Sequence, residues 1–124
     1  METIAVVLSV KPDQVAAFEA GFREHELPIW HDYEAEGVMT RASLTKMGIT
    51  SAPRGDAVQY LIVVDFATGE GHDRHDGDPR FEAWNRIADA YQVGEGMAFG
   101  GETILKVGGG PDFQARSRTV PSPR

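Results

Sequence analysis

The sequence predicts an α+β domain whose elements follow the order strand, helix, strand, strand, helix, strand. Short segments rich in β-branched residues have the length of strands, and two longer segments repeat apolar residues at the spacing of amphipathic helices. The 124 residues suit a single domain, because a chain of this size buries about two-thirds of its unfolded surface when it folds.

In the first half of the chain, a strand over residues 3–10 ends at a Lys-Pro-Asp turn, and a helix follows. The apolar stripe of that helix consists of Val15, Phe18, Phe22 and Ile29. We expect the helix to kink or stop at Pro28, because proline cannot donate a backbone hydrogen bond. A second strand, polar at alternate positions, is expected over residues 38–47, and an exposed loop follows it over residues 48–56.

The second half carries the clearest signal, which is an apolar strand followed by a capped helix. The strand is Val58–Phe66. Asp78 is a favourable N-cap and Pro79 fits the first helical position, so the helix is expected over residues 79–91. Its apolar positions are Phe81, Trp84, Ala88 and Tyr91. The last strand is expected over residues 103–107.

We expect one domain over residues 1–107 and a flexible C-terminal tail over residues 108–124. The tail begins with three glycines, contains three prolines and has no core-forming periodicity.

Composition excludes several classes of function. The formal net charge of −7 opposes binding to nucleic acid or to an anionic membrane, since both require a basic surface. Without cysteine the chain has no disulfide, thiolate nucleophile or cysteine metal site. It also lacks a signal peptide and an apolar run of roughly 18 to 20 residues, so we expect a cytoplasmic protein with no membrane contact.

The strand Val58–Phe66 is apolar on both faces. Tyr60 and Ile62 point to one side, whereas Leu61 and Val63 point to the other. Two helices can cover only one face of the sheet. We therefore expect a two-fold homodimer in which the second faces of two sheets pack together.

The predicted order is that of the split-βαβ, or ferredoxin-like, plan with an antiparallel sheet. In its details the chain resembles the dimeric α/β-barrel superfamily, which includes antibiotic-biosynthesis monooxygenases, small polyketide cyclases and haem-degrading oxygenases. The resemblance lies in the Leu27-Pro28 break before Gly37-Val38, in the strand over residues 60–66, and in the Asp-Pro-Arg-Phe-Glu-Ala-Trp segment over residues 78–84. It extends over about residues 3–107 and specifies the fold better than the reaction.

The resemblance implies a pocket between helices and sheet in each subunit. Helical and strand phase predict an aromatic, mostly apolar wall that suits an aromatic or polyketide-like substrate. The expected substrate-binding residues are Phe22, Trp30, Tyr33, Ile62 and Trp84. The alternative is that these aromatic side chains simply fill the core.

Histidines are the expected bases, because imidazole titrates near neutral pH. His25 lies near the apolar stripe of the first helix, and His31 stands among Trp30, Asp32 and Tyr33. Either one would withdraw an acidic phenolic or α-carbonyl proton, and Tyr60 would hold the resulting oxyanion. The alternative for each histidine is a structural hydrogen bond.

The segment over residues 69–78 contains His72, His75 and several carboxylates between glycines. Two histidines and a carboxylate suit zinc or iron, but the spacing is not diagnostic, and we predict no metal site. A loop that acts as a lid, with His75 or Asp76 reaching inward, is the preferred interpretation. The glycines over residues 94–101 do not form a dinucleotide fingerprint, so no organic cofactor is predicted.

These observations favour an enzyme of specialised metabolism that abstracts a proton without a cofactor and thereby starts an oxygenation, a cyclisation or a dehydration. Haem degradation is disfavoured, because the helix over residues 79–91 has no histidine to ligate iron. The alternatives are a non-catalytic dimer that binds a hydrophobic ligand or assists a partner enzyme, and a metal-dependent enzyme built on the His72 segment.

Overall fold

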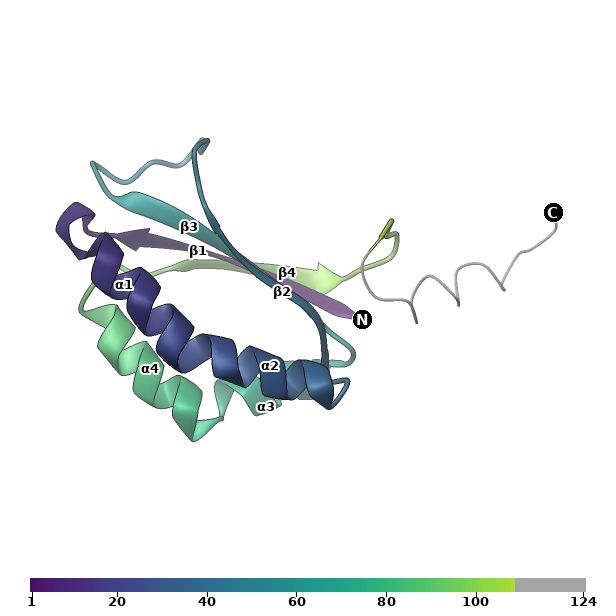
Figure 1. Cartoon of the computed structure of the whole chain (residues 1–124). Coiled ribbons are helices and arrows are strands. Elements are labelled where there is room, and N and C mark those ends of the chain that lie inside the picture. The colour runs from purple at the N-terminus through teal and green to yellow at the C-terminus, as the bar shows by residue number, and fades with distance from the viewer. Residues whose placement is uncertain (109–124) are drawn as a thin grey trace, which may run out of the picture.

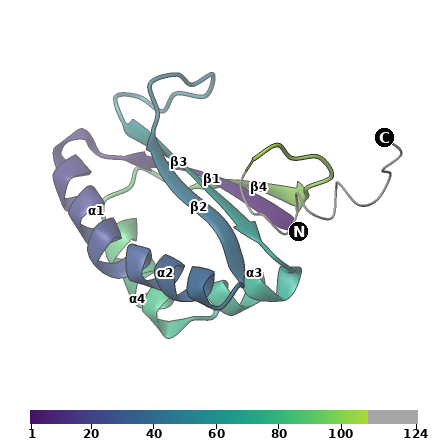
Figure 2. The ribbon, with the colours of Figure 1, turned by 45° about the vertical axis from the view of Figure 1, so that its right-hand side comes forward.

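The computed structural model describes residues 1–108, which form a four-stranded antiparallel sheet with every helix on one of its faces (Figures 1 and 2). The strand order across the sheet is β2-β3-β1-β4. The elements are β1 (Glu2–Val10), α1 (Val15–Gly21), α2 (Leu27–Ala35), β2 (Met39–Lys46), β3 (Val58–Phe66), α3 (Gly69–Asp76), α4 (Pro79–Asp89) and β4 (Met97–Glu102). This is the ferredoxin-like arrangement that the sequence predicts.

The first helical segment does not stop at Pro28. A short 3-10 turn (Pro12–Gln14), α1, a π-helical turn (Phe22–Glu26) and α2 follow one another without a break, and Pro28 lies in the first turn of α2. In the π turn the N–H of Leu27 bonds to the carbonyl of Phe22, five residues earlier. The π turn therefore shifts the helical phase just ahead of the proline. As a result, Glu26 is buried together with Phe22 and Ile29.

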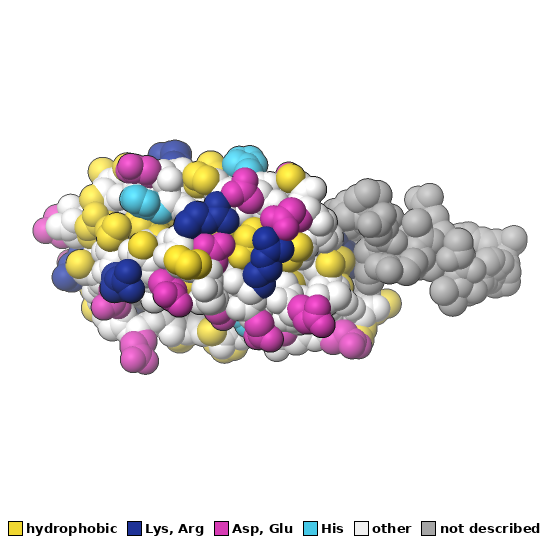
Figure 3. Space-filling view, turned by 90° about the horizontal axis from the view of Figure 1, so that it is seen from below, with side chains coloured by type: hydrophobic (Ala, Val, Ile, Leu, Met, Phe, Trp, Pro, Cys, Tyr) yellow, Lys and Arg dark blue, Asp and Glu magenta, His cyan; other side chains and the backbone are white. Residues whose placement is uncertain are grey.

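The core lies between the helices and the facing side of the sheet. Its buried members include Phe18, Phe22, Ile29, Tyr33, Tyr60, Val64, Phe66 and Trp84. On the helix-bearing face seen in Figure 3, acidic and basic side chains are interspersed with hydrophobic ones. No helix of residues 1–108 is long and apolar enough to cross a membrane.

The last strand lies earlier than predicted, at Met97–Glu102 and not at residues 103–107. It pairs with β1, from Met97 opposite Val7 to Glu102 opposite Glu2. Gly100 packs directly on β1, because a Cβ atom there would lie 2.5 Å from Cδ1 of Ile4. Glycine has low strand propensity, so the sequence pattern pointed instead to the more apolar segment beyond it.

The predicted lid loop is also different, because residues 69–76 form the helix α3. Gly71 brings this helix close to the sheet, since a Cβ atom there would lie 2.7 Å from Cγ1 of Val38. His72 and His75 are therefore carried by a helix that packs next to β3.

The outer face of the sheet bears no helix (Figure 1). Strand register places six apolar residues on it, which we call the outer apolar patch: Ala5, Val7, Leu61, Val63, Met97 and Phe99. Beside this patch, buried Asp65 binds Thr3 and Lys106. Of the predicted tail, only Gly108 belongs to the described residues, and residues 109–124 lie outside them.

Candidate functional site

A cavity of about 530 Å³ lies between the helices α3 and α4 and the strands β1, β3 and β4. Most of its wall is apolar, and the hydrophobic lining includes Ile4, Val6, Leu8, Trp30, Ile62, Val64, Phe66, Phe81 and Trp84. Its polar lining consists of Glu26, His72, His75, Asp76, Asn85, Asp89, Gln92 and Glu95. An apolar cavity with a few convergent polar groups is typical of small-molecule sites.

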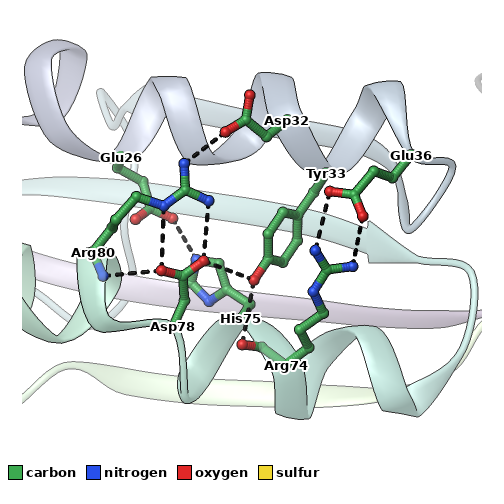
Figure 4. Close-up of polar contacts among 8 residues, drawn as sticks. All are labelled: Glu26, Asp32, Tyr33, Glu36, Arg74, His75, Asp78 and Arg80. Atoms are coloured by element: carbon green, nitrogen blue, oxygen red, sulfur yellow. Dashed lines mark hydrogen bonds and ion pairs between the residues drawn. The ribbon is translucent and has the colours of Figure 1, made fainter.

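Within this wall, Glu26 and His75 form a buried hydrogen-bonded pair. His75 Nε2 lies 2.7 Å from Glu26 Oε2, and the side chains are only 11% and 5% exposed (Figure 4). The other ring nitrogen, Nδ1, lies 3.3 Å from Oδ1 of Asp76. The ring of Phe81 packs on the imidazole at a centroid distance of 4.4 Å. The pair therefore combines low solvent access with a defined orientation.

Local structure explains how the pair forms. The π turn brings Glu26 to the buried side of the first helical segment, and His75 lies in the last turn of α3. Burial acts to lower the pKa of His75, but the hydrogen bond and charge of Glu26, supported by Asp76, outweigh burial and raise it above its ordinary value. The imidazolium form is therefore stabilised.

Glu26 also has an unused acceptor. Its Oε1 atom is buried and has no hydrogen-bond partner among residues 1–108. A buried carboxylate oxygen without a donor is costly, so this position favours a donor from a molecule that enters the cavity.

A second network fixes the helices around the pair (Figure 4). The Tyr33 hydroxyl on α2 donates to Asp78 Oδ2 at 3.0 Å, and Asp78 caps α4 by accepting from the Arg80 N–H at 2.9 Å. Arg80 also reaches Asp32 at 2.6 Å, and Arg74 on α3 reaches Glu36 at 2.8 Å. Burial, followed by the bond to Asp78, raises the pKa of Tyr33 to about 12, so this phenol stays protonated. These bonds connect α2 to α3 and to the start of α4.

The three residues predicted as catalytic lie apart from one another and outside this cavity. His25 is half-buried and stacks on Trp84 at a centroid distance of 5.5 Å. His31 is exposed and lies beside a separate, smaller hollow. The Tyr60 hydroxyl donates to Glu19 at 2.6 Å in a third hollow, near Lys46. The bond to Glu19 holds the Tyr60 hydroxyl away from the cavity, His25 is held against Trp84, and His31 is exposed to solvent.

The residues predicted to bind substrate divide into two groups. Trp30, Ile62 and Trp84 line the cavity. Phe22 belongs to the core, and Tyr33 is engaged in the network of Figure 4. Of the segment predicted as a lid, His72, His75 and Asp76 all line the cavity. Across the described part of the chain, no group of three or more histidine or acidic residues is placed to hold a metal ion.

Sequence reasoning missed Glu26, although a signal was present. Glu26 lies four residues after Phe22 and three before Ile29, so it occupies the apolar stripe of the helix. A carboxylate at such a position is unusual, because burying it requires a partner. That partner comes from another element and cannot be identified by helical phase.

No protein-family model and no curated protein sequence matches this chain. Solved structures do match it. An antibiotic biosynthesis monooxygenase homologue from Nitrosomonas europaea is 14% identical with a TM-score of 0.68, and the match covers 85% of this chain and 100% of that one. A dimeric ferredoxin-like protein from an uncultured marine organism is 8% identical with a TM-score of 0.65, over 86% of this chain and 98% of that one.

SnoaB from Streptomyces nogalater, described as a cofactor-independent oxygenase, is 14% identical with a TM-score of 0.61. That match covers 86% of this chain and 95% of SnoaB. The chain has the ferredoxin-like fold of these proteins. The comparison confirms the fold that the sequence resemblance implied. At these identities it is the ferredoxin-like fold that is shared, so function has to be argued from the cavity.

Proposed function

We propose that this protein is an enzyme that abstracts a proton from an aromatic or polyketide-like small molecule, without an organic cofactor, in the cavity that Glu26 and His75 line. The observation that supports this proposal is the buried Glu26–His75 pair in an otherwise apolar wall. His75 replaces His25 and His31 as the proposed base, because it is the histidine that combines a carboxylate partner, burial and access to the cavity.

The geometry gives each member of the pair a role. In the neutral tautomer, Nε2–H of His75 donates to Glu26, and Nδ1 is the basic nitrogen, which a substrate reaches when the exposed Asp76 side chain, 3.3 Å away, turns aside. When Nδ1 takes the proton of a phenol or of a carbon next to a carbonyl, Glu26 stabilises the imidazolium that forms. The Asn85 amide, also on the cavity wall, is a candidate donor for the resulting oxyanion.

Oxygenation is the favoured fate of that anion, because SnoaB, which shares the fold, is a cofactor-independent oxygenase. For a methylene group activated by neighbouring rings, dioxygen would deliver one oxygen atom as a carbonyl. The other oxygen atom would leave as water with the two hydrogens. The substrate supplies the electrons in this balance, so no external reductant is required.

We also propose a two-fold homodimer formed through the outer apolar patch. Leu61 and Val63 are only half-buried in the single chain, and Phe99 is 61% exposed. Apolar sheet faces of this kind are stable when a second sheet covers them. The structural match described as a dimeric ferredoxin-like protein supports dimer formation. In light scattering, wild type should have twice the mass of a Val63→Glu variant.

Oxygen consumption with anthrone-type substrates tests the catalytic role. We expect His75→Asn to lower kcat at least about a hundredfold, the usual range for losing a general base. His25→Ala and His31→Ala should retain turnover and serve as matched controls. Collapse of turnover in either control, with His75→Asn still active, would restore the original sequence-based assignment. Unchanged ligand binding with no turnover in wild type would instead indicate a carrier.

A further inference from the structure

The charged residues that line the cavity are predominantly acidic. Four carboxylates line the cavity, from Glu26, Asp76, Asp89 and Glu95, and none of its described lining residues is lysine or arginine. The two arginines that flank His75 in the chain are engaged elsewhere, Arg80 with Asp32 and Asp78, and Arg74 with Glu36 (Figure 4). The described lining residues therefore offer no lysine or arginine to an anionic ligand.

The two histidines of the cavity wall do not make it basic, because each one contacts a carboxylate. His72 lies 3.0 Å from Glu2 and 3.1 Å from Asp76, and His75 lies 2.7 Å from Glu26. Each imidazole therefore faces at least one carboxylate, and a proton on either ring is already balanced by its neighbour. Asp89 and Glu95 have no such partner in the structure's described part and lie at the exposed rim.

A separate observation indicates that a ligand supplies a donor. Glu26 is 5% exposed, it lines the cavity, and its Oε1 atom is buried without a partner among the described residues. Its other oxygen is already committed to His75. An N–H donor entering the cavity would satisfy the free oxygen, and a positively charged donor would do so most strongly.

We propose that the cavity selects ligands that combine an apolar ring body with a protonated amine, and that it discriminates against carboxylates. The ring body packs on Trp30, Trp84 and Ile62, and the ammonium faces Glu26 and the acidic rim. This inference deepens the proposed function, on whose cavity it rests.

Three probes with one ring body test this inference: naphthylmethylamine, naphthylmethanol and naphthoate, substituted at the same ring carbon. Isothermal titration calorimetry on the full chain at neutral pH should rank affinity as ammonium, then alcohol, then carboxylate. We expect at least about a tenfold difference between the first and the last, which corresponds to about 1.4 kcal/mol. Equal or tighter binding of naphthoate would overturn the proposal, and so would no binding of any probe at millimolar concentration.

Substitutions test which carboxylates cause the preference for an amine. Glu26→Gln keeps the side-chain volume and should reduce the ratio of amine to alcohol affinity about fivefold or more. Asp89→Asn at the exposed rim should reduce it about twofold, which keeps the test available if Glu26→Gln fails to fold. Glu82→Gln, on α4 but outside the cavity lining, removes the same charge and should leave the ratio unchanged.

An equal effect of Glu82→Gln would attribute the preference to the net charge of the chain and overturn the proposal. The binding order is measured without turnover, so it stands even if His75 is not the catalytic base. Conversely, His75-dependent turnover in a cavity that prefers naphthoate would overturn this inference alone.

Discussion

Oε2 of Glu26 lies 2.7 Å from Nε2 of His75, although 49 positions separate the two residues in the chain. The contact joins the π turn of the first helical segment to α3, and both side chains line the cavity beside the sheet. A buried pair of this kind is strongly destabilising when only one member is removed, because the other is left uncompensated. Substituting either member of the pair should therefore affect both the stability of the fold and the proposed reaction.

The titration of His75 should depend on Glu26. The pKa of His75 is raised in the folded protein, so the neutral, proton-accepting form becomes dominant only above the ordinary value of about 6.5. In Glu26→Gln the pKa should fall, and the acid limb of kcat/KM should move to lower pH. Nuclear magnetic resonance of the imidazole checks the same shift without activity. Glu24→Gln, exposed on the same helical segment, is the matched control; an equal shift there would contradict the assignment.

The same pair should make stability depend on pH. A histidine with a raised folded-state pKa contributes stability that is fully present below about 6.5 and is lost as pH rises through the folded-state pKa. The free energy of unfolding of wild type should therefore decrease over this interval, relative to a His75→Gln variant. Urea denaturation at a series of pH values measures the difference. Parallel curves for the two proteins would show that His75 is not stabilised in its charged form.

Asp78 should stabilise the start of α4. It accepts from the Arg80 N–H and from the Tyr33 hydroxyl, so Asp78→Ala should lower the free energy of unfolding by about 1–2 kcal/mol, as loss of a helix cap does. Asp78→Asn should retain much of the cap. The pKa of Asp78 is lowered to about 2, mainly by Arg80, so its charge-dependent contribution should be lost as pH falls from about 3.8 toward 2. Chemical denaturation of Glu82→Ala provides the control, and equal losses in both variants would contradict this role.

Two glycines of β4 should respond differently to alanine. A Cβ atom at Gly100 would lie 2.5 Å from Cδ1 of Ile4 and 3.1 Å from the carbonyl oxygen of Thr3, whereas Gly101 has no such neighbour within 4 Å. Gly100→Ala should destabilise the protein by about 1–3 kcal/mol through overpacking. Gly101→Ala should be nearly neutral. Thermal unfolding measures the stability of both variants, and equal melting temperatures would contradict the strand register between β4 and β1.

Tyr60 should matter for stability more than for turnover. Its hydroxyl is buried against Glu19 at 2.6 Å and does not line the main cavity. Burial, followed by the Glu19 bond, raises the pKa of Tyr60, so the phenol stays protonated. Tyr60→Phe should lower the free energy of unfolding by about 0.5–1.5 kcal/mol and leave kcat/KM within about twofold. A large loss of kcat with unchanged stability would support the oxyanion role expected from the sequence.

The periodicity of side chains predicts the fold well, because it is local. Alternation in Val58–Phe66 and the cap at Asp78 are each set by neighbours within a few residues, and both elements have the predicted bounds or start. The exceptions are segments whose local signal is weak. Glycine-rich β4 and the glycine-bounded helix α3 have low intrinsic propensity, so packing against Ile4 and Val38 decides their structure.

The candidate site depends on relationships that periodicity does not contain. Straight-helix spacing places both His25 and Glu26 near the apolar stripe, and in the structure, with its π turn, Glu26 is the buried one of the two. His75 becomes its partner only because α3 is a helix that packs at the edge of the cavity. The sequence by itself determined the order of the strands and of the two longer helical segments, and the apolar character of both sheet faces, since these follow from local spacing. Tertiary structure alone decided which ionisable groups meet, because a hydrogen bond between distant elements requires their packing to bring the atoms within 3 Å.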